Sequence, residues 1–359
     1  MKVALLHDYF AEPGRSGGGE KLATAVAESF KADVFTGFVD EKFTGLERLN
    51  VTEISTKTSS GLRTLDLMKR FGELRIPGYG LYIFSGTNCI TASAAHHPNL
   101  LYCHTPPRYL YDLKSWFNAN TGLFGRIGLW YLRSKVYPKD QFFMRQFDKI
   151  VTNSENVRKR LLFYYGKELY DKSDVVYSFV DMEKFSWKKP GGFYLSTARL
   201  DRLKRVGLII EAFKRIPEKK LVVLSSGPEA ENIKRMINSQ ENIEMTGWLP
   251  EKDMLSMLAR CTATIQMPLD EDMGLGAIES MAAGKPCIAA NEGGLKETII
   301  DKKTGLLIEA NEKAIADAVI WMDDKKSMSM KKACLSRARF FSRKNFIKRM
   351  KKAAAEVMR

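Results

Sequence analysis

Cysteine is scarce in this sequence, and its few cysteines form no pattern that would use them together. The 359 residues include five, which are far apart: Cys89, Cys103, Cys261, Cys287 and Cys334. No CxxC pair occurs, and the number is odd, which argues against a disulfide framework. We therefore expect reduced, mostly buried thiols, as in a cytoplasmic protein.

Long hydrophobic runs are missing as well. No stretch of about 18 apolar residues occurs, so no membrane-spanning helix is expected. Met1–Asp8 is too short for a signal peptide and instead indicates a first buried strand. Hydrophobic residues still make up 45% of the chain, and its length allows roughly two domains with separate cores.

Acidic residues are nearly absent from the C-terminal end. From Lys325 to Arg359, thirteen Lys and Arg face only Glu356, and this tail supplies most of the formal net charge of +15. A basic helix of this kind binds nucleic acid, anionic lipid or only water. Because no helix-turn-helix, zinc-finger or RNA-binding signature accompanies it, nucleic acid is not an expected partner.

A second basic segment is also rich in aromatic residues. Residues 113–146 hold eight aromatic side chains and six cations against the single acid Asp140. Trp and Phe mixed with Lys and Arg suit a membrane interface, although a helix packed on its own domain with a solvated basic face fits equally well. Peripheral contact with an anionic membrane, at its cytoplasmic face, is therefore one expectation.

Short apolar runs alternate with helical patterns along the whole chain. Val3–Leu6, Leu81–Phe84 and Leu100–Cys103 are typical of buried strands in the first half, and Cys89–Thr91 is another candidate strand. Alternating strands and helices predict parallel sheets in an α/β protein. A linker-like composition at 184–192 predicts an N-terminal domain over 1–185 and a second over 186–340. A basic helix over 341–359 would pack back on the first.

The stretch Pro268–Cys287 carries the clearest functional signal. Glu271 and Glu279 flank a glycine-rich turn, Met273-Gly274-Leu275-Gly276, which leads into a predicted helix from Ala277 to Ala283. Free backbone N–H groups at a helix N-terminus attract anions. Carboxylates on both sides of such a site can accept hydrogen bonds from hydroxyl groups. The combination suits a sugar joined to a nucleotide diphosphate.

This stretch resembles the donor-sugar motif of retaining glycosyltransferases of family 4. The resemblance implies a GT-B fold: two Rossmann-like domains whose parallel sheets face a central cleft. It also implies that Glu271 meets the donor sugar, Glu279 meets the nucleotide ribose, and Gly274, Leu275 and Gly276 surround the phosphates. Met273 stands where the family usually has an aromatic residue, and Ser280 where it has alanine.

Basic and glycine-rich loops complete the expected donor site. Arg199 ends a predicted strand, and Lys204 begins the next helix; such a pair can neutralise a leaving diphosphate. Arg202 and Arg205 are expected to face solvent or the ribose. The family resemblance extends to Gly17, Gly18 and Gly19 before the first helix, and Gly227 follows another strand. The glycine run is not a P-loop, because no Lys-Ser/Thr follows it.

His104 lies at the end of an apolar run, before a proline-stiffened loop in Leu101–Asp112. This string resembles that of mannosyl-transferring members of the family, whose histidine contacts the donor sugar. Arg108 and Asp112 are candidates for orienting the acceptor, and Asp8 is a candidate for the same side. The Asp-x-Asp pattern at 270–272 overlaps the glutamate motif, so no metal or other cofactor is expected.

The resemblance thus implies a retaining hexosyltransferase, and we expect it to move mannose from GDP-mannose to a growing or polyprenyl-linked glycan. Arg199 and Lys204 would stabilise the departing diphosphate, and His104 would reach the sugar from the first domain. A UDP-sugar donor remains an alternative. So do a nucleotide-sugar epimerase of the same fold and a non-catalytic basic scaffold at a membrane.

Overall fold

The computed structural model of the chain describes residues 1–11, 18–55, 60–238 and 240–358. The chain forms two compact units. The first comprises Met1–Tyr177 together with Ile347–Arg359, and the second comprises Ser178–Phe346. The change of unit therefore falls at 177/178 rather than in the expected linker.

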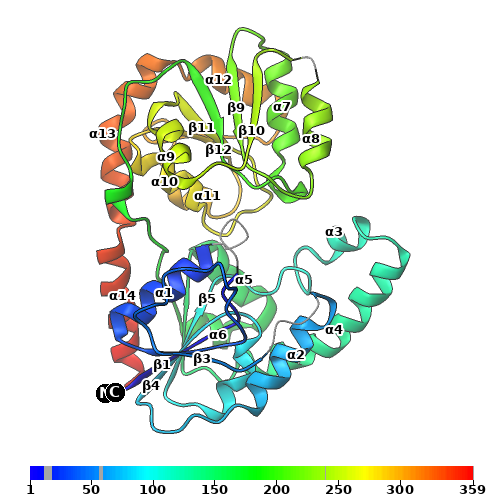
Figure 1. Cartoon of the computed structure of the whole chain (residues 1–359), viewed down its shortest axis with the longest axis vertical. Coiled ribbons are helices and arrows are strands. Elements are labelled where there is room, and N and C mark those ends of the chain that lie inside the picture. Colours follow the sequence, from blue (N-terminus) through cyan, green and yellow to red (C-terminus); the bar gives the residue numbers. More distant parts are fainter. Residues whose placement is uncertain (12–17, 56–59, 239, 359) are drawn as a thin grey trace. The chain divides into compact units, whose positions relative to one another are not determined.

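The first unit is built on a parallel sheet with strand order β3-β2-β1-β4-β5-β6-β7 (Figure 1). Strands β1, β4 and β5 are buried along their whole length, as their apolar runs predict. The elements of this unit are β1 (Val3–His7), α1 (Gly18–Phe30), β2 (Asp33–Thr36), β3 (Val51–Glu53), α2 (Ser60–Glu73), β4 (Leu81–Ser85), the 3-10 helix η1 (Cys89–Ala95), β5 (Asn99–Cys103), α3 (Lys114–Ala119), α4 (Leu123–Met144), β6 (Lys149–Thr152), α5 (Glu155–Tyr165), α6 (Lys167–Asp171) and β7 (Ser173–Val175).

The second unit repeats this architecture with strand order β10-β9-β8-β11-β12-β13, again parallel throughout. Helix α14 begins in this unit and ends in the first. The elements are η2 (Met182–Lys184), β8 (Phe193–Ser196), η3 (Arg202–Lys204), α7 (Val206–Lys214), β9 (Lys220–Leu224), α8 (Ala230–Ile237), β10 (Ile243–Gly247), α9 (Glu251–Arg260), β11 (Ala263–Gln266), α10 (Leu275–Ala282), β12 (Cys287–Ala290), α11 (Leu295–Thr298), β13 (Gly305–Ile308), α12 (Glu312–Trp321), α13 (Asp324–Phe340) and α14 (Arg343–Val357).

Two local predictions fail for identifiable reasons. Cys89–Thr91, expected as a strand, starts the 3-10 helix η1, because the Asp8 carboxylate accepts the backbone N–H groups at its start. Residues 184–192, expected as a linker, pack on the second unit. There the Lys188 N–H donates to the carbonyl of Ala259, and the buried Lys285 donates its Nζ to the carbonyl of Lys188.

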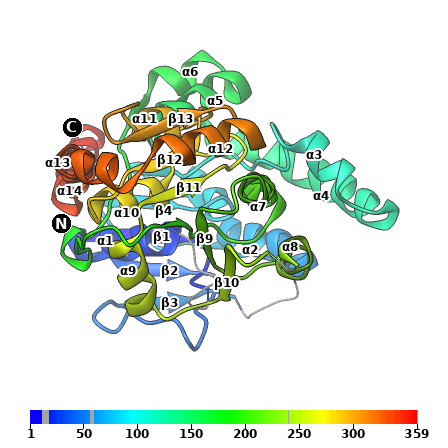
Figure 2. The same ribbon diagram turned by 90° about the horizontal axis from the view of Figure 1, so that it is seen from above.

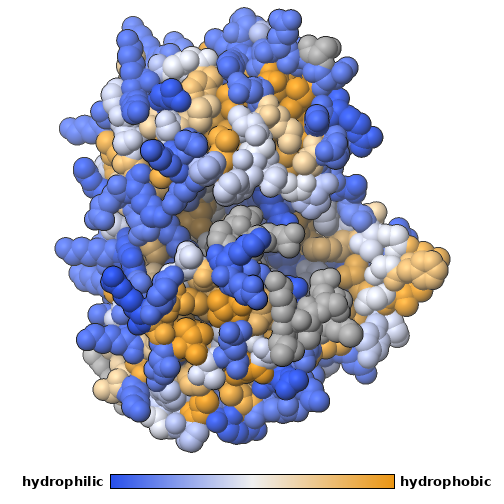
Figure 3. All heavy atoms as spheres, in the orientation of Figure 1, coloured by the Kyte–Doolittle hydropathy of each residue, from blue (hydrophilic) through white to orange (hydrophobic). Residues whose placement is uncertain are grey.

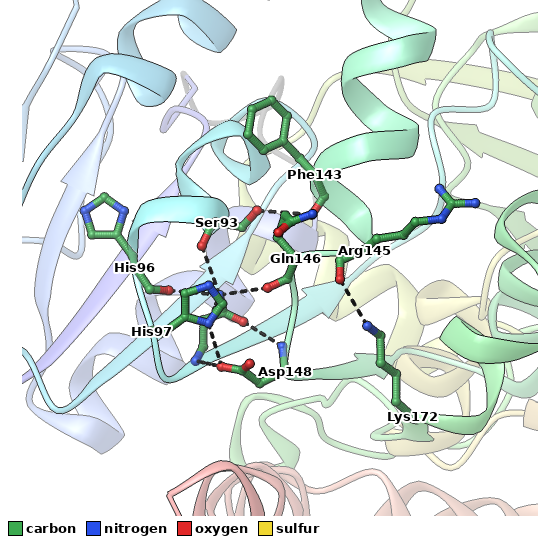
Figure 4. A network of polar contacts seen from close by, with 9 residues as sticks. Ser93, His96, His97, Phe143, Arg145, Gln146, Asp148 and Lys172 are labelled. Carbon is green, nitrogen blue, oxygen red and sulfur yellow. Dashed lines mark hydrogen bonds and ion pairs between the residues drawn. The ribbon is translucent and has the colours of Figure 1, made fainter.

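A polar network ties the loops before β5 and β6 together, and Figure 4 shows His97 and Asp148 joined within it. The Asn99 side-chain amide donates to the carbonyls of Ser93, His96 and Gln146, while Asn99 and Asp148 exchange backbone-to-side-chain bonds of 2.8 and 2.9 Å. His97 also bonds Asp148, at 3.0 Å. The two neighbouring histidines thus serve loop structure, and this end of the sheet is firmly held. All five cysteines are free and buried, as predicted.

Candidate functional site

The expected donor residues of the second unit gather at one edge of its sheet. Strands β8 and β11 are neighbours, but the chain continues from β8 toward β9 and from β11 toward β12, on opposite sides. Such a switch point leaves a crevice beyond the carboxyl ends of the strands, where α/β proteins bind ligands. Arg199 and Lys204 follow β8, and Glu271 follows β11.

Lys204 and Glu271 meet directly beyond the ends of these two strands. Lys204 Nζ lies 2.6 Å from Glu271 Oε2, and both side chains are partly exposed. The two loops are joined below this pair by a backbone bond of 2.8 Å from the Leu269 N–H to the Leu203 carbonyl. Asp201 caps η3 by accepting the Lys204 N–H. The cation and the carboxylate are therefore held on fixed backbone and remain accessible to a ligand.

Arg205 secures the loop that carries Glu271. Its Nε donates to the carbonyl of Met267 at 2.6 Å, and its Nη2 donates to the carbonyl of Pro268 and to Glu292 Oε2, at 2.7 and 2.9 Å. Arg205 is thus partly buried and bonded within the protein rather than fully solvated, and its expected position on the ribose side stays a prediction. Arg202, by contrast, is exposed and pairs with Glu229 at 3.0 Å. Sequence reasoning missed both the clamp and its partner Glu292.

Substituting Arg205 tests the clamp. Arg205→Met should lower the free energy of unfolding by about 1.5–3 kcal/mol, because charge-assisted bonds are lost and Glu292 is left without its guanidinium partner. The measurement is urea unfolding, with hydrogen exchange of residues 267–271. The control is Arg215→Met, which removes an exposed pair with Glu312 and should cost at most about 1 kcal/mol. Equal effects of the two variants would contradict the clamp.

The glycine-rich turn brings helix α10 close to the sheet. Gly274 is the N-cap residue with φ of 87°, and a Cβ on Gly276 would lie 2.1 Å from Gln266 Nε2 at the end of β11. The positive φ therefore favours glycine at 274, whereas at 276 an added Cβ would have to displace only the end of the Gln266 side chain. The helix begins at Leu275, two residues earlier than predicted. In its first turn the Ala277 N–H bonds back to the Gly274 carbonyl at 3.1 Å. The anion site expected at this helix N-terminus stays a prediction.

The two departures from the family pattern have structural explanations. Met273 is buried, and its Sδ accepts the Ser178 N–H at 3.3 Å, so it points into the second unit. Ser280 is also buried; its hydroxyl accepts from Thr264 at 2.8 Å and lies 3.1 Å from the carbonyl of Lys285. Neither substitution leaves a buried polar group without a partner.

The remaining donor residues lie at the same edge of the sheet. Arg199 is exposed just beyond β8, and Glu279 is half-buried on α10. A Cβ on Gly227 would lie 2.4 Å from the Leu200 carbonyl oxygen, so glycine lets the loop after β9 pack on the loop after β8. The structure thus places the expected donor residues of the second unit on neighbouring loops, joined by backbone hydrogen bonds.

The switch point of the first unit lies between β1 and β4. Two histidines, a serine and the start of helix α1 meet there. His7 Nδ1 donates to the carbonyl of Ser85. Ser85 Oγ shares a hydrogen bond of 2.9 Å with His104 Nε2, beyond the end of β5. A Cβ on Gly19 would come 3.7 Å from the His104 ring, so the start of α1 lies against it. Gly18 begins α1, and Gly17 lies outside the described residues.

His104 is neutral at physiological pH. Burial, and to a smaller extent the neighbouring His7, together lower the pKa of its imidazole to about 3. A neutral imidazole can exchange hydrogen bonds with a hydroxyl without adding a positive charge. His104 is therefore suited to orienting a sugar and does not titrate between pH 5 and 8.

Asp8, Arg108 and Asp112 are engaged within the first unit. The Asp8 carboxylate accepts from the backbone N–H groups of Thr87, Asn88 and Cys89 at 2.8–3.1 Å, which gives it a structural role. Arg108 pairs with Asp112 through two nitrogens, at 2.7 and 2.8 Å. Their expected contacts with an acceptor remain predictions, which would require a ligand to compete with these bonds.

The loop after His104 is fastened by residues that sequence reasoning did not single out. The buried Arg160 donates to Thr105 Oγ1 at 2.6 Å. Asp140, also buried, accepts from the hydroxyls of Tyr111 and Tyr165. Burial raises the pKa of the Asp140 carboxyl to about 6, although both tyrosine bonds act in the opposite direction. The one available signal was an isolated acid in a long basic segment.

Within the described parts of the chain, no group of three or more His, Cys, Asp or Glu side chains could hold a metal ion. The Asp-x-Asp stretch is instead held by backbone contacts: the Gly294 N–H donates to the Glu271 carbonyl at 2.7 Å, and the Asp270 N–H donates to Glu292 at 3.2 Å. The absence of a metal requirement remains a prediction for experiment.

Residues 179–351 match the family model of Glycosyl transferases group 1. This match nearly coincides with the second unit, Ser178–Phe346, and includes the Lys204–Glu271 pair and the α10 turn. The second unit is therefore a group 1 glycosyltransferase domain.

Known proteins agree with this assignment. An uncharacterized glycosyltransferase of Methanocaldococcus jannaschii is 28% identical over 166 residues, 46% of each chain. The alpha-1,3/1,6-mannosyltransferase ALG2 of Dictyostelium discoideum is 24% identical over 264 residues, 61% of this chain and 60% of that protein. The chain matches about half of the length of its curated relatives.

Solved structures extend the likeness to both units. The crystal structure of Anabaena Alr3699/HepE in complex with UDP and glucose has a TM-score of 0.75 and 15% identity, and the match covers 99% of both chains. The predicted GT-B architecture of two Rossmann-like domains with parallel sheets is thereby confirmed.

Proposed function

We propose that this protein is a retaining hexosyltransferase that moves a sugar from a nucleotide-sugar donor to an acceptor hydroxyl. The observation that supports this most is the Lys204–Glu271 pair, 2.6 Å apart beside the N-terminus of α10. A cation and helix N–H groups suit a diphosphate, while a carboxylate suits sugar hydroxyls. Glu279, four residues after Leu275 on the same helix, is proposed to meet the ribose.

The proposed reaction needs no protein nucleophile. The bond between the sugar C1 and the diphosphate oxygen breaks, and its electron pair stays on the leaving diphosphate, which Arg199 and Lys204 stabilise. The acceptor oxygen bonds C1 on the same face, and its proton passes to a donor phosphate oxygen. Glu271 holds the sugar hydroxyls, and neutral His104 is proposed to bond another hydroxyl of the sugar.

GDP-mannose is the proposed donor, and a growing or polyprenyl-linked glycan is the proposed acceptor. The His104–Asp112 loop and the likeness to a mannosyltransferase of Dictyostelium discoideum support mannose. The structural relative that holds UDP and glucose favours the second candidate, a UDP-sugar. A nucleotide-sugar epimerase would require no acceptor, so product analysis with and without acceptor separates it from a transferase.

Ligand-induced shifts in melting temperature provide the direct test. A ligand that binds only the native state raises the apparent melting temperature. Wild type should shift with GDP and GDP-mannose, more than with UDP, ADP or their sugar conjugates, and EDTA should leave the shift unchanged. A shift with UDP compounds alone would overturn the donor assignment. No shift with any nucleotide would contradict the proposed roles of Arg199, Lys204 and Glu279 and favour the scaffold.

A further inference from the structure

Helices α3 and α4 extend away from the sheet of the first unit in both views (Figures 1 and 2). We call residues 114–144 the arm. Many large apolar residues of α4 are exposed to solvent: Phe124 is 88% exposed, Leu123 70% and Trp130 69%. Ile127 and Tyr131 are at least half exposed as well. Figure 3 shows hydrophobic side chains gathered at the end of this arm.

These apolar residues lie on one side of the helix. Leu123, Ile127, Trp130 and Tyr137 follow helical spacings of three, four and seven residues, which align side chains along one face. Monomeric proteins rarely leave a contiguous apolar face of this kind uncovered, and such a face usually marks an interaction surface. Because this apolar face runs over several helical turns, it suits a broad, flat binding surface better than a small pocket on another protein.

The charged residues around this apolar face indicate what kind of partner it binds. Lys114, Lys135 and Lys139 are exposed beside it. The only acid within 113–146 is Asp140, which is buried and bonded to two tyrosines. An apolar face with a cationic border and no exposed carboxylate is complementary to an anionic lipid surface.

A pocket of about 570 Å³ lies between α3 and α4. Lys114 and Arg126 supply positive charge to its wall, while Trp130 and Tyr137 supply aromatic surface. Arg133 keeps this geometry by donating to the carbonyl of Tyr109 at 2.8 Å and to Asn118 Oδ1 at 2.6 Å. A basic rim over aromatic walls suits a lipid phosphate with its glycerol and first methylene groups.

The arm is suited to lie on a bilayer rather than to cross it. Among the described residues, no helix is both long enough and apolar enough to span a membrane. Helix α4 combines an apolar face with basic flanks, the pattern of helices that rest in the interfacial plane. We propose that the arm docks this protein on an anionic phospholipid surface, with Leu123, Phe124 and Trp130 in the acyl boundary and Lys114 at the phosphates.

Vesicle flotation tests this proposal without any sugar donor, so its result is independent of the proposed transfer. Wild type should float at low salt with phosphatidylcholine vesicles that contain phosphatidylglycerol, and less at high salt. Phe124→Glu/Trp130→Glu should reduce the bound fraction by about tenfold or more, because two charges enter the apolar face. The matched control is Phe163→Glu on α5, where Phe163 is 80% exposed outside the arm.

Three more variants locate the binding surface. Lys135→Glu/Lys139→Glu should weaken flotation more than Lys351→Glu/Lys352→Glu on α14. Tryptophan emission should shift to the blue on vesicles, and this shift should shrink in Trp130→Phe. All substituted residues are exposed, and unchanged melting temperatures would verify folding.

Several outcomes would overturn the proposal. Absence of flotation at low salt would do so, and so would equal losses in Phe163→Glu and the arm variant. If only Lys351→Glu/Lys352→Glu lost flotation with vesicles, lipid binding would be assigned to helix α14 instead of the arm. Light scattering without vesicles provides a final check: a dimer that the arm substitutions dissociate would assign the face to a second copy of the chain.

Discussion

Replacing Glu271 with glutamine is expected to reduce sugar transfer by about 10²–10³-fold while leaving nucleotide affinity nearly intact. Glutamine keeps the size of the side chain but removes the negative charge that strengthens hydrogen bonds from sugar hydroxyls. Nucleotide binding would depend on Lys204, Arg199 and the α10 turn, which remain. The measurement is steady-state transfer from GDP-mannose, with nucleotide affinity followed by calorimetry.

A matched surface pair provides the control for Glu271→Gln. Glu244 lies 3.1 Å from Lys220 on the strands β10 and β9, and both are exposed. Glu244→Gln removes an ion pair of the same type from the same unit and should leave transfer unchanged. Partly exposed pairs contribute at most about 1 kcal/mol, so neither variant should unfold. Full turnover by Glu271→Gln would refute the assignment of this carboxylate.

Replacing Lys204 with methionine should lower kcat/KM by about 10²–10³-fold, and in this variant nucleotide binding should weaken too. The ammonium group would neutralise the diphosphate both in the bound donor and as it departs. Lys204→Arg should recover part of the activity, because the charge returns with a different shape. The checks are kcat, KM and the melting-temperature shift with GDP, and Lys220→Met is the control.

Since Lys204 and Glu271 touch, the effects of Lys204→Met and Glu271→Gln should not add. A double variant should lose less activity than the product of the single losses. Strict additivity would indicate that the two side chains act on separate parts of the ligand and that their 2.6 Å contact has no functional role. Unchanged GDP binding by Lys204→Met would contradict a diphosphate role for this lysine.

Local features of the donor site could be predicted from the sequence, because neighbouring residues create them. The α10 turn needs only Gly274, Gly276 and the helix that follows, and its start was predicted to within two residues. The strands β1, β4 and β5 were predicted because their apolar runs are continuous. The short strands β3, β7 and β13 have three or four residues each and leave no clear pattern.

Contacts between residues that lie far apart in the sequence could not be predicted from it. Arg205 bonds carbonyls more than 60 positions away, and Asp8 caps a helix some 80 positions away. From the sequence alone, an arginine that bonds distant carbonyls cannot be told from one that is solvated. The pairing of Ser85 with His104 depends on the register of β4 and β5, which only the folded sheet fixes.

The course of the last helix bears on how this protein is made. Met350, Ala353 and Ala354 are buried, Glu356 pairs with Lys149 at 3.0 Å, and all four belong to the first unit. The first unit therefore cannot complete its surface until residues 347–356 have left the ribosome. The second unit is complete earlier, at Phe346. Folding during synthesis cannot run strictly from the N-terminal to the C-terminal domain, and a nascent chain stalled before residue 347 would leave apolar surface exposed to chaperones.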